Sequence, residues 1–211
     1  MRFNGPVSSD QTADETTAEA AAVPAAEPVT ALPRRTWPYL LVAAAFVLVL
    51  DIVSKLVVVA QLQGEEPKPI LGGLVYLQLL RNSGAAFGIA TGMTWILSLI
   101  VIAVIVAIIW IVPRLRSIGW AIGLGFVLAG ALGNLSDRIF RAPGPLRGHV
   151  VDWISVFKPN GAAFAVFNLA DSGICVGGAL IVLMALLGKE YDGRTGKQDS
   201  KQNTSKQVAG E

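Results

Sequence analysis

The chain has 211 residues, of which 53% are hydrophobic and 15% are charged, with a formal net charge of +2. Soluble domains are about 45–50% apolar and about 25% charged, so this composition indicates a membrane protein and excludes a soluble enzyme with an ordinary core. The small net charge, without a basic cluster among aromatic residues, gives no support for nucleic-acid binding. Cys175 is the single cysteine, which excludes an intramolecular disulfide and a cysteine-based metal site.

Residues 1–36 are predicted to be a disordered cytoplasmic tail. They are rich in Ala, Glu, Thr and Pro and hold hardly any large apolar residue, so they cannot bury enough surface to offset the entropy of ordering. No apolar segment follows a basic start, so this end lacks the pattern of a secretory signal. The hydrophilic residues 189–211 are predicted to be a second disordered cytoplasmic tail. The expected domain therefore spans residues 37–188.

Four stretches of this domain are long and apolar enough to cross a bilayer, which takes about 20 residues at ~1.5 Å of rise each. They are Tyr39–Ala60, Trp95–Val112, Trp120–Phe140 and Ala162–Leu187. Between the first two, the alternating run from Ile70 to Leu80 predicts a short strand or hairpin at the membrane surface. The predicted fold is an all-α membrane protein with four transmembrane helices. A small β platform and a loop or short helix are expected on its outer face.

An even number of spans places both termini on one side of the membrane, and the charges of the loops indicate which side. With the termini inside, the cytoplasmic segments hold Arg34, Arg35, Arg114, Arg116, Lys189, Arg194, Lys197, Lys201 and Lys206. The outer segments then hold Lys68, Arg81, Arg141, Arg147 and Lys158. Cytoplasmic loops carry the excess of Lys and Arg, so both termini are expected in the cytoplasm.

Ionisable and amide side chains within the apolar segments are the most informative feature of the sequence. A charge near the bilayer centre costs ~2.5–3.5 kcal/mol on insertion scales, so such residues usually face a partner or a water-filled cavity. Five segments carry them: DIVSK with Asp51 and Lys55, RNSGAAFG with Asn82, GNLSDRIF with Asn134, Asp137 and Arg138, GHVVDW with His149 and Asp152, and FNLADS with Asn168 and Asp171. A functional site built from these segments is therefore expected.

Spacing within the segments indicates structural roles for several of these residues. Asp51 and Lys55 are four apart with the acid first, so they share a helical face, and we interpret them as an ion pair. Arg138 shares a face with Asn134, and a guanidinium can bind a carboxylate of another helix through two hydrogen bonds. A role in organising the site is therefore favoured for Arg138. Cys175 is interpreted as a small buried apolar residue.

Two aspartates are the candidates for chemistry. Asn168 and Asp171 are three apart near the outer end of the last span, and Asp152 lies 19 residues before Asp171 on the same side. If the two carboxylates meet, repulsion and desolvation keep one protonated while the other stays ionised. Such a pair supplies a general acid and a general base for attack of water on an amide. Composition and spacing alone do not separate Asp137 from Asp152 as a member of this pair.

Two other classes of protein fit the same polar residues. A small ion or proton-coupled transporter also carries charges in its spans, but the low span count and the lack of an inverted repeat argue against it. A membrane scaffold uses polar residues to join helices, and five separate polar segments argue against that class.

Taken together, DIVSK, NSGAAFG, GNLSDR, GHVVDW and FNLAD resemble the ordered motif set of the lipoprotein signal peptidases, the type II signal peptidases. The resemblance covers residues 37–187 and rests on all five motifs in order, because each is short and weak alone. It implies a bacterial inner-membrane enzyme that cleaves diacylglyceryl-modified prolipoproteins on the N-terminal side of the lipidated cysteine, near the outer face. The implied partners are these substrates and membrane lipid, with binding of a globomycin-type inhibitor and a monomeric state.

The resemblance also assigns residues to roles. It places the catalytic pair at Asp152 and Asp171, and it leaves open which of them is the base. Substrate-binding or site-supporting roles fall on Asn82, Gly84, Asn134, Asp137, Arg138, Asn168, Asp51 and Lys55. No metal or organic cofactor is implied. The glycine-rich region from 82 to 92 and the strand before it are expected to form a platform that clamps the substrate.

Overall fold

The structure is a computed structural model of the chain, and it describes residues 1–2, 35–84 and 94–194. The chain divides into two units, Met1–Leu32 and Pro33–Glu211, and the helices and strands given below belong to the second unit. Most of the two predicted tails, and residues 85–92 of the predicted glycine-rich clamp, lie outside the described residues. Their predicted disorder and clamping role stay predictions.

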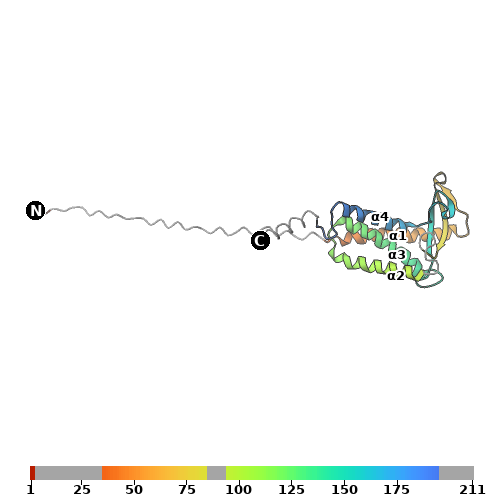
Figure 1. The fold of residues 1–211 in the computed structure, drawn as a ribbon, viewed down its shortest axis with the longest axis horizontal. Coiled ribbons are helices and arrows are strands. Elements are labelled where there is room, and N and C mark those ends of the chain that lie inside the picture. Colours follow the sequence, from red (N-terminus) through yellow and green to blue (C-terminus); the bar gives the residue numbers. More distant parts are fainter. Residues whose placement is uncertain (3–34, 85–93, 195–211) are drawn as a thin grey trace, which may run out of the picture. The chain divides into compact units, whose positions relative to one another are not determined.

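Four long helices lie side by side in the second unit (Figure 1). They are α1 (Trp37–Leu62), α2 (Thr94–Ile111), α3 (Ile118–Phe140) and α4 (Leu169–Leu186). Each helix is long and apolar enough to cross a membrane, with α2 continuing through a 3-10 turn, η3 (Val112–Arg114). The four predicted spans are therefore confirmed, and the ends of the first three differ from prediction by at most two residues.

The predicted start of the fourth span at Ala162 was wrong, because α4 begins at Leu169. Residues 162–167 are apolar enough to continue the helix by composition, yet Phe167 pairs with Ile154 in an antiparallel bridge. Asn168 then starts the helix with a capping box: its side chain accepts from the N–H of Asp171, whose carboxylate accepts from the N–H of Asn168. Local hydrogen bonds, rather than hydropathy, determine where this helix begins.

A three-stranded antiparallel sheet stands across one end of the helices (Figure 1). Its strands are β1 (Lys68–Ile70), β2 (Val75–Asn82) and β3 (Val150–Val156), in the order β1-β2-β3, with a 3-10 turn, η1 (Leu71–Gly73), between the first two. The predicted hairpin is confirmed. Strand β3 was not predicted, and it carries Asp152 opposite Leu80 of β2. The sequence had suggested only that Asp152 lies on the approach to the last span. A further 3-10 turn, η4 (Pro159–Gly161), follows β3.

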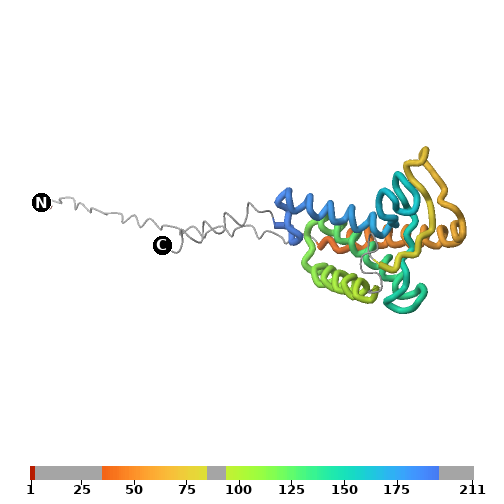
Figure 2. The backbone as a smooth tube through the Cα atoms, turned by 45° about the vertical axis from the view of Figure 1, so that its right-hand side comes forward, coloured from red at the N-terminus to blue at the C-terminus, as the bar shows by residue number. Residues whose placement is uncertain are grey.

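Helix α3 is at the centre of the bundle and packs against each of the other three helices. Figure 2 shows α2 lying along α3. Glycines on α3 bring the backbones of its neighbours close, as is usual between membrane helices. A Cβ at Gly125 would lie 2.6 Å from the carbonyl oxygen of Leu40 on α1, and one at Gly130 would overlap the carbonyl oxygen of Ala170 on α4. Helix α3 therefore fixes the position of α4, which carries Asp171.

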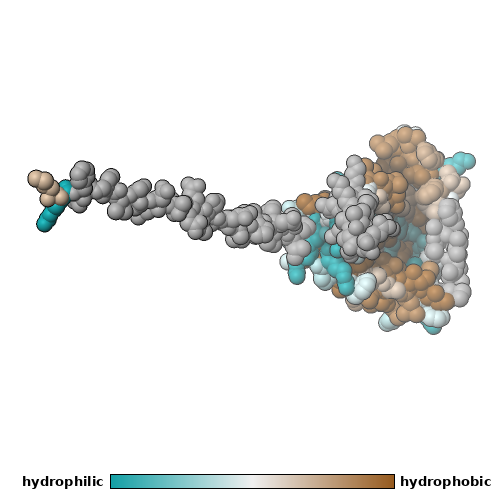
Figure 3. All heavy atoms as spheres, turned by 60° about the vertical axis from the view of Figure 1, so that its left-hand side comes forward, coloured by the Kyte–Doolittle hydropathy of each residue, from teal (hydrophilic) through white to brown (hydrophobic). Residues whose placement is uncertain are grey.

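The end of the bundle opposite the sheet is closed by residues 189–194. The carbonyl oxygen of Tyr191 accepts hydrogen bonds from the backbone N–H groups of Arg116 and Ser117, and Trp120 Nε1 donates to the carbonyl oxygen of Lys189 over 2.7 Å. Hydrophilic residues gather at this end, while apolar residues cover the sides of the helices (Figure 3). Residues just past the predicted boundary at residue 188 thus contact the helices, and the boundary itself stays a prediction.

Candidate active site

Asp152 is held on β3 by two amide side chains. Its Oδ2 accepts a hydrogen bond from Asn82 Nδ2 over 2.8 Å, and its Oδ1 accepts one from Asn168 Nδ2 over 2.7 Å. The side chain is buried, with 2% of its surface exposed. Burial, reinforced by the negative charge of Asp171, raises the pKa of Asp152 to about 7, against hydrogen bonds from Asn82 and Asn168 that lower it. This carboxyl group can therefore carry a proton near neutral pH.

Asp171 lies in the first turn of α4. Its Oδ1 accepts a hydrogen bond from Asn134 Nδ2 over 2.8 Å, and its Oδ2 accepts the backbone N–H of Asn168 over 3.1 Å. The N-terminal turn of a helix favours negative charge, because its free N–H groups form the positive end of the helix dipole. Asp171 is therefore held by an amide of α3 and by the N-terminal backbone of α4.

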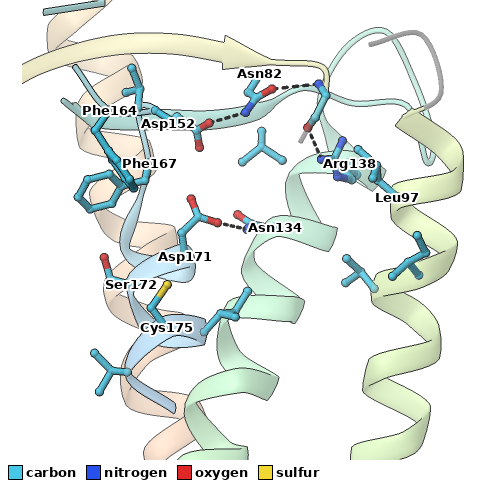
Figure 4. Close-up of a pocket in the computed structure, with 18 residues that line it drawn as sticks. Asn82, Leu97, Asn134, Arg138, Asp152, Phe164, Phe167, Asp171, Ser172 and Cys175 are labelled. Carbon is cyan, nitrogen blue, oxygen red and sulfur yellow. Dashed lines mark hydrogen bonds between the residues drawn. The ribbon is translucent and has the colours of Figure 1, made fainter. Parts of the chain in front are cut away.

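Asn168 joins the two aspartates. Its Nδ2 donates to Asp152, while its Oδ1 and its backbone N–H complete the capping box with Asp171. Asn168 Nδ2 also lies 3.2 Å from Asn134 Oδ1, which brings the amide of α3 into the same network. Figure 4 shows Asp152 above Asp171, with Asn134 beside them. The structure thus brings together two carboxyl groups that lie on different elements and are bridged by one residue, Asn168.

A network of buried charges lies behind the two aspartates. Lys55 Nζ lies 2.8 Å from Asp51 Oδ2 and 3.0 Å from Asp137 Oδ2, so the predicted ion pair of Asp51 and Lys55 is confirmed and Asp137 joins it. Asp137 also binds Arg141 and accepts the backbone N–H of Val151 over 3.1 Å. Asp137 is therefore bound by two cations and by the backbone of β3. Asp152 differs from it, because amide side chains bind its carboxyl group.

Arg138 does not bind a carboxylate through two hydrogen bonds, as its spacing had suggested. Its Nη2 donates to the carbonyl oxygen of Gly84 over 2.9 Å, and its Nη1 has no hydrogen-bond partner among the residues that the structure describes. Gly84 in turn donates its N–H to Asn82 Oδ1 over 2.9 Å. Arg138 thereby holds the end of β2, where Asn82 reaches Asp152. The neighbouring residues 85–93 lie outside the described part of the chain.

The aspartates face a pocket with a volume of about 600 Å³. Six of the predicted site residues line it, namely Asn82, Gly84, Asn134, Arg138, Asp152 and Asp171. The others, Asp51, Lys55, Asp137 and Asn168, do not line it and are buried. Among the described residues, no group of three or more His, Cys, Asp or Glu side chains is placed to hold a metal ion.

Apolar residues that line the pocket were not predicted as site residues. They include Leu97, Ile100 and Val101 on α2, and Phe164 and Phe167 on the segment before α4. Nothing in an apolar helix distinguishes the residues that face a pocket from those that face lipid, so the sequence held no signal for the α2 residues. Phe167 had one, because it is the first residue of the FNLAD segment, and Phe164 lies three residues before it.

Cys175 was predicted to be buried, and this was wrong. The cysteine is exposed, and it lines the pocket one helical turn beyond Asp171 (Figure 4). A helical turn takes 3.6 residues, so the side chains of positions 171 and 175 share a face of α4. That face forms one wall of the pocket below the aspartates.

Comparisons with known proteins agree with this architecture. The sequence model of the family described as "Signal peptidase (SPase) II" matches residues 43–187. The chain belongs to the lipoprotein signal peptidase family. The lipoprotein signal peptidase of Mycobacterium avium is 50% identical over 169 residues, covering 79% of this chain and 90% of that protein. That of Mycobacterium tuberculosis is 48% identical over 180 residues, covering 85% of this chain and 87% of that protein.

Two solved structures, both described as bacterial membrane enzymes studied by the in meso method, share the fold. One, at 2.3 Å resolution, has a TM-score of 0.62 and 26% identity, and it covers 73% of this chain and 91% of its own. The other, at 1.9 Å resolution, has a TM-score of 0.62 and 27% identity, and it covers 75% of this chain and 99% of its own. As a lipoprotein signal peptidase, the chain is a bacterial multi-pass membrane protein and an aspartic endopeptidase that removes signal peptides from lipidated prolipoproteins.

Proposed function

We propose that Asp152 and Asp171 are the catalytic aspartates of this signal peptidase. The observation that carries the proposal is that one residue, Asn168, binds both carboxyl groups, Asp152 through its side-chain amide and Asp171 through its backbone N–H, and that both aspartates line one pocket. The other two aspartates of the apolar segments, Asp51 and Asp137, contact the buried ammonium of Lys55 and do not line the pocket. Asp152 and Asp171 are thus the two of the four that are placed to meet a substrate.

The raised pKa of Asp152 assigns different roles to the two carboxyl groups. Asp171, at the start of α4, is the general base: it takes a proton from water, whose oxygen attacks the scissile carbonyl carbon. Asp152, protonated because of its raised pKa, donates its proton to the carbonyl oxygen as the tetrahedral intermediate forms. When the intermediate collapses, the C–N bond breaks. The proton on Asp171 passes to the leaving amine, and the carbonyl oxygen returns its proton to Asp152.

The apolar walls of the pocket support binding of a lipidated peptide. Leu97 and Val101 on α2 face Ile174 and Val176 on α4 across the space that lies below the aspartates. Acyl chains of a diacylglyceryl group lie in the apolar interior of a bilayer, where association depends on van der Waals packing, and these walls offer such contact. Binding of the lipid in this pocket places the bond on the N-terminal side of the lipidated cysteine near the two carboxyl groups.

Two substitutions test the catalytic pair. Purified protein in detergent receives a diacylglyceryl-modified prolipoprotein, and the shortened product is measured for the parent, Asp152→Asn and Asp171→Asn. General acid–base catalysis contributes about 10²–10⁴-fold, so each variant should lose at least ~100-fold in rate. Asp192→Asn, which changes an aspartate near Arg194 and far from the pocket, is the matched control. Cleavage at the parent rate by either site variant would refute the pair.

The proposal includes an orientation, with both termini in the cytoplasm and the sheet on the outer face. It rests on the excess of Lys and Arg at the end of the bundle that holds residues 114–116 and 189–194. In a Cys175→Ser background, Lys158→Cys and Arg194→Cys each provide a single thiol. A membrane-impermeant maleimide is added to intact cells whose plasma membrane is directly accessible to the reagent. It should label the thiol at position 158 and leave the thiol at position 194 unlabelled. The reverse labelling pattern would show the opposite orientation, with both termini outside.

A globomycin-type inhibitor is proposed to occupy the same pocket, and the enzyme is proposed to be a monomer. The first is tested by competition: increasing the concentration of lipidated substrate should relieve the inhibition. Light scattering of the detergent-solubilised protein tests the second and should give the mass of one chain. A non-competitive pattern or a dimer mass would contradict the respective proposal.

A further inference from the structure

Lys55 is a buried cation that lies close to three oxygen atoms. Its ammonium nitrogen lies 2.8 Å from Asp51 Oδ2, 3.0 Å from Asp137 Oδ2 and 3.2 Å from Asn134 Oδ1. Only 1% of the Lys55 surface is exposed. An ion pair that merely joins helices needs the two carboxylates, whereas the third contact goes to an amide of the active site. This third contact links Lys55, through Asn134, to the carboxylate of Asp171.

The contact between Lys55 and Asn134 determines which way the amide of Asn134 points. An ammonium group has only donors, so the oxygen of Asn134 must face it. The nitrogen of the same amide then faces the other way and donates to Asp171 Oδ1 over 2.8 Å. A flipped amide would place N–H groups against the ammonium and its oxygen against the carboxylate of Asp171, and both contacts would be repulsive. Lys55, together with Asn168 Nδ2, which also donates to Asn134 Oδ1, therefore orients the amide so that its N–H group donates to Asp171.

The two carboxylates bound to Lys55 also hold the backbone next to each catalytic aspartate. Asp51 Oδ1 accepts the N–H of Ala170, the residue before Asp171, over 2.9 Å. Asp137 Oδ2 accepts the N–H of Val151, the residue before Asp152, over 3.1 Å. The ammonium of Lys55 on α1 is thus connected, through Asp51 and Asp137, to the backbone of the residues that precede Asp171 on α4 and Asp152 on β3.

We propose that Lys55 is a positioning residue for catalysis, which sets the direction of the Asn134 amide and thereby the hydrogen bond that the base Asp171 accepts. The proposal rests on the catalytic pair proposed above. Lys55 touches no reacting atom, and it acts through Asn134 and the two carboxylates. Its loss should therefore reduce kcat, while binding of the lipidated peptide in the apolar pocket should change little.

A charge-balanced variant separates this role from helix packing. Lys55→Met alone leaves Asp51 and Asp137 buried without their shared cation, which is strongly destabilising. In the double variant Asp51→Asn with Lys55→Met, one of those charges is removed, Asp137 keeps Arg141, and an amide oxygen remains to accept the N–H of Ala170. The single variant Asp51→Asn is the matched control, because it retains Lys55, whose ammonium still faces Asn134.

The expected result is a folded double variant whose kcat falls about 100-fold below that of Asp51→Asn, the size expected when a catalytic group is displaced by about 1 Å. Its KM for the lipidated prolipoprotein should stay within about threefold of that of the control. Equal kcat in the two variants, a raised KM with unchanged kcat, or failure of the double variant to fold would each overturn the proposal. Failure to fold would assign Lys55 a purely structural role.

A second measurement does not depend on activity. In protein with ¹⁵N-labelled asparagine, the side-chain NH₂ signal of Asn134 is assigned from its loss in Asn134→Asp. This group should exchange slowly with deuterated water in Asp51→Asn and faster in the double variant, because one of the two donors that hold the oxygen of the Asn134 amide is then gone. Equal exchange in both would refute the positioning role. If Asp152→Asn or Asp171→Asn still cleaves, the catalytic pair fails while this readout still reports on Lys55.

Discussion

The pKa of Asp152 at about 7 predicts how the enzyme responds to pH. The ordinary value for an aspartate is near 4, and burial raises it because the charged form loses its water. Asp152 is therefore protonated below about 7 and loses its proton as the pH rises through that value. If it is the general acid, kcat should fall as the pH rises through about 7. The check is kcat of the detergent-solubilised enzyme across neutral pH, and a rate that keeps rising there would contradict the assignment.

A substitution of Asn82 provides a second test of whether Asp152 is the general acid. Its hydrogen bond to Asp152 lowers the pKa of that carboxyl group, so replacing Asn82 with Leu removes a stabiliser of the charged form. The pKa of Asp152 should then rise, and the alkaline fall in kcat should move to higher pH. The residual activity of Asn82→Leu, measured over the same pH range as the parent, gives the shift. An unmoved profile would show that another group controls the fall.

Asn168 has two functions that one substitution separates. Asn168→Ser keeps an oxygen that can cap α4, but serine is too short to donate to Asp152 as the Nδ2 group does over 2.7 Å. We expect the thermal midpoint to change little while kcat falls about 100-fold. Asn168→Ala also removes the cap and should cost about 1 kcal/mol of stability in addition. A serine variant with parent kcat would show that the bridge to Asp152 is dispensable.

At the scale of elements, the α3–α4 contact controls the position of Asp171. A Cβ at Gly130 would overlap the carbonyl oxygen of Ala170, and this backbone atom can move only if the start of α4 moves. Gly130→Ala should therefore lower the stability by about 1–3 kcal/mol and reduce kcat as well. Gly178→Ala is the control, because a Cβ there meets nothing within 4 Å. Thermal unfolding in detergent and cleavage assays on both variants check this expectation.

The sequence predicted the four helices because length and hydropathy alone identify membrane spans. It did not predict where α4 begins, since residues 162–167 are as apolar as the helix and the start is decided by the capping bonds of Asn168. Strand β3 was missed for a related reason. Its partner β2 is far away in the sequence, and both neighbours of Asp152 on its N-terminal side, Val150 and Val151, are buried rather than alternating with exposed residues.

The sequence predicted which residues belong to the candidate site, but it predicted fewer of the hydrogen bonds and ion pairs between them. Polar groups in apolar segments stand out, so all ten predicted residues are found in or behind the pocket. Their partners depend on how each helix is rotated about its axis, and nearly uniform apolar spans carry little information about rotation. The link from Lys55 through Asn134 to Asp171, across three helices, could therefore not be read from spacing.

At the scale of the whole molecule, residues just past the predicted boundary at residue 188 contact the helices. Residues 189–191 supply acceptors to Arg116, Ser117 and Trp120, and the rings of Tyr191 and Trp120 lie 6.1 Å apart. A chain that ends after Gly188 should therefore unfold at a lower temperature than one that ends after Arg194. The second truncation should keep the melting temperature and activity of the full chain. Equal melting of the two truncations would contradict the role of this segment.

Asn168 has a consequence for the order in which the enzyme becomes active during its synthesis. The residue that starts the last helix is also the residue that binds both aspartates, so forming the first turn of α4 and assembling the proposed catalytic pair are the same event. A nascent chain that has inserted only α1 to α3 carries one aspartate of the pair and no bridge. With the proposed pair, we therefore expect the peptidase to gain its activity only when its last helix docks, and an incomplete chain in the membrane to have no proteolytic activity.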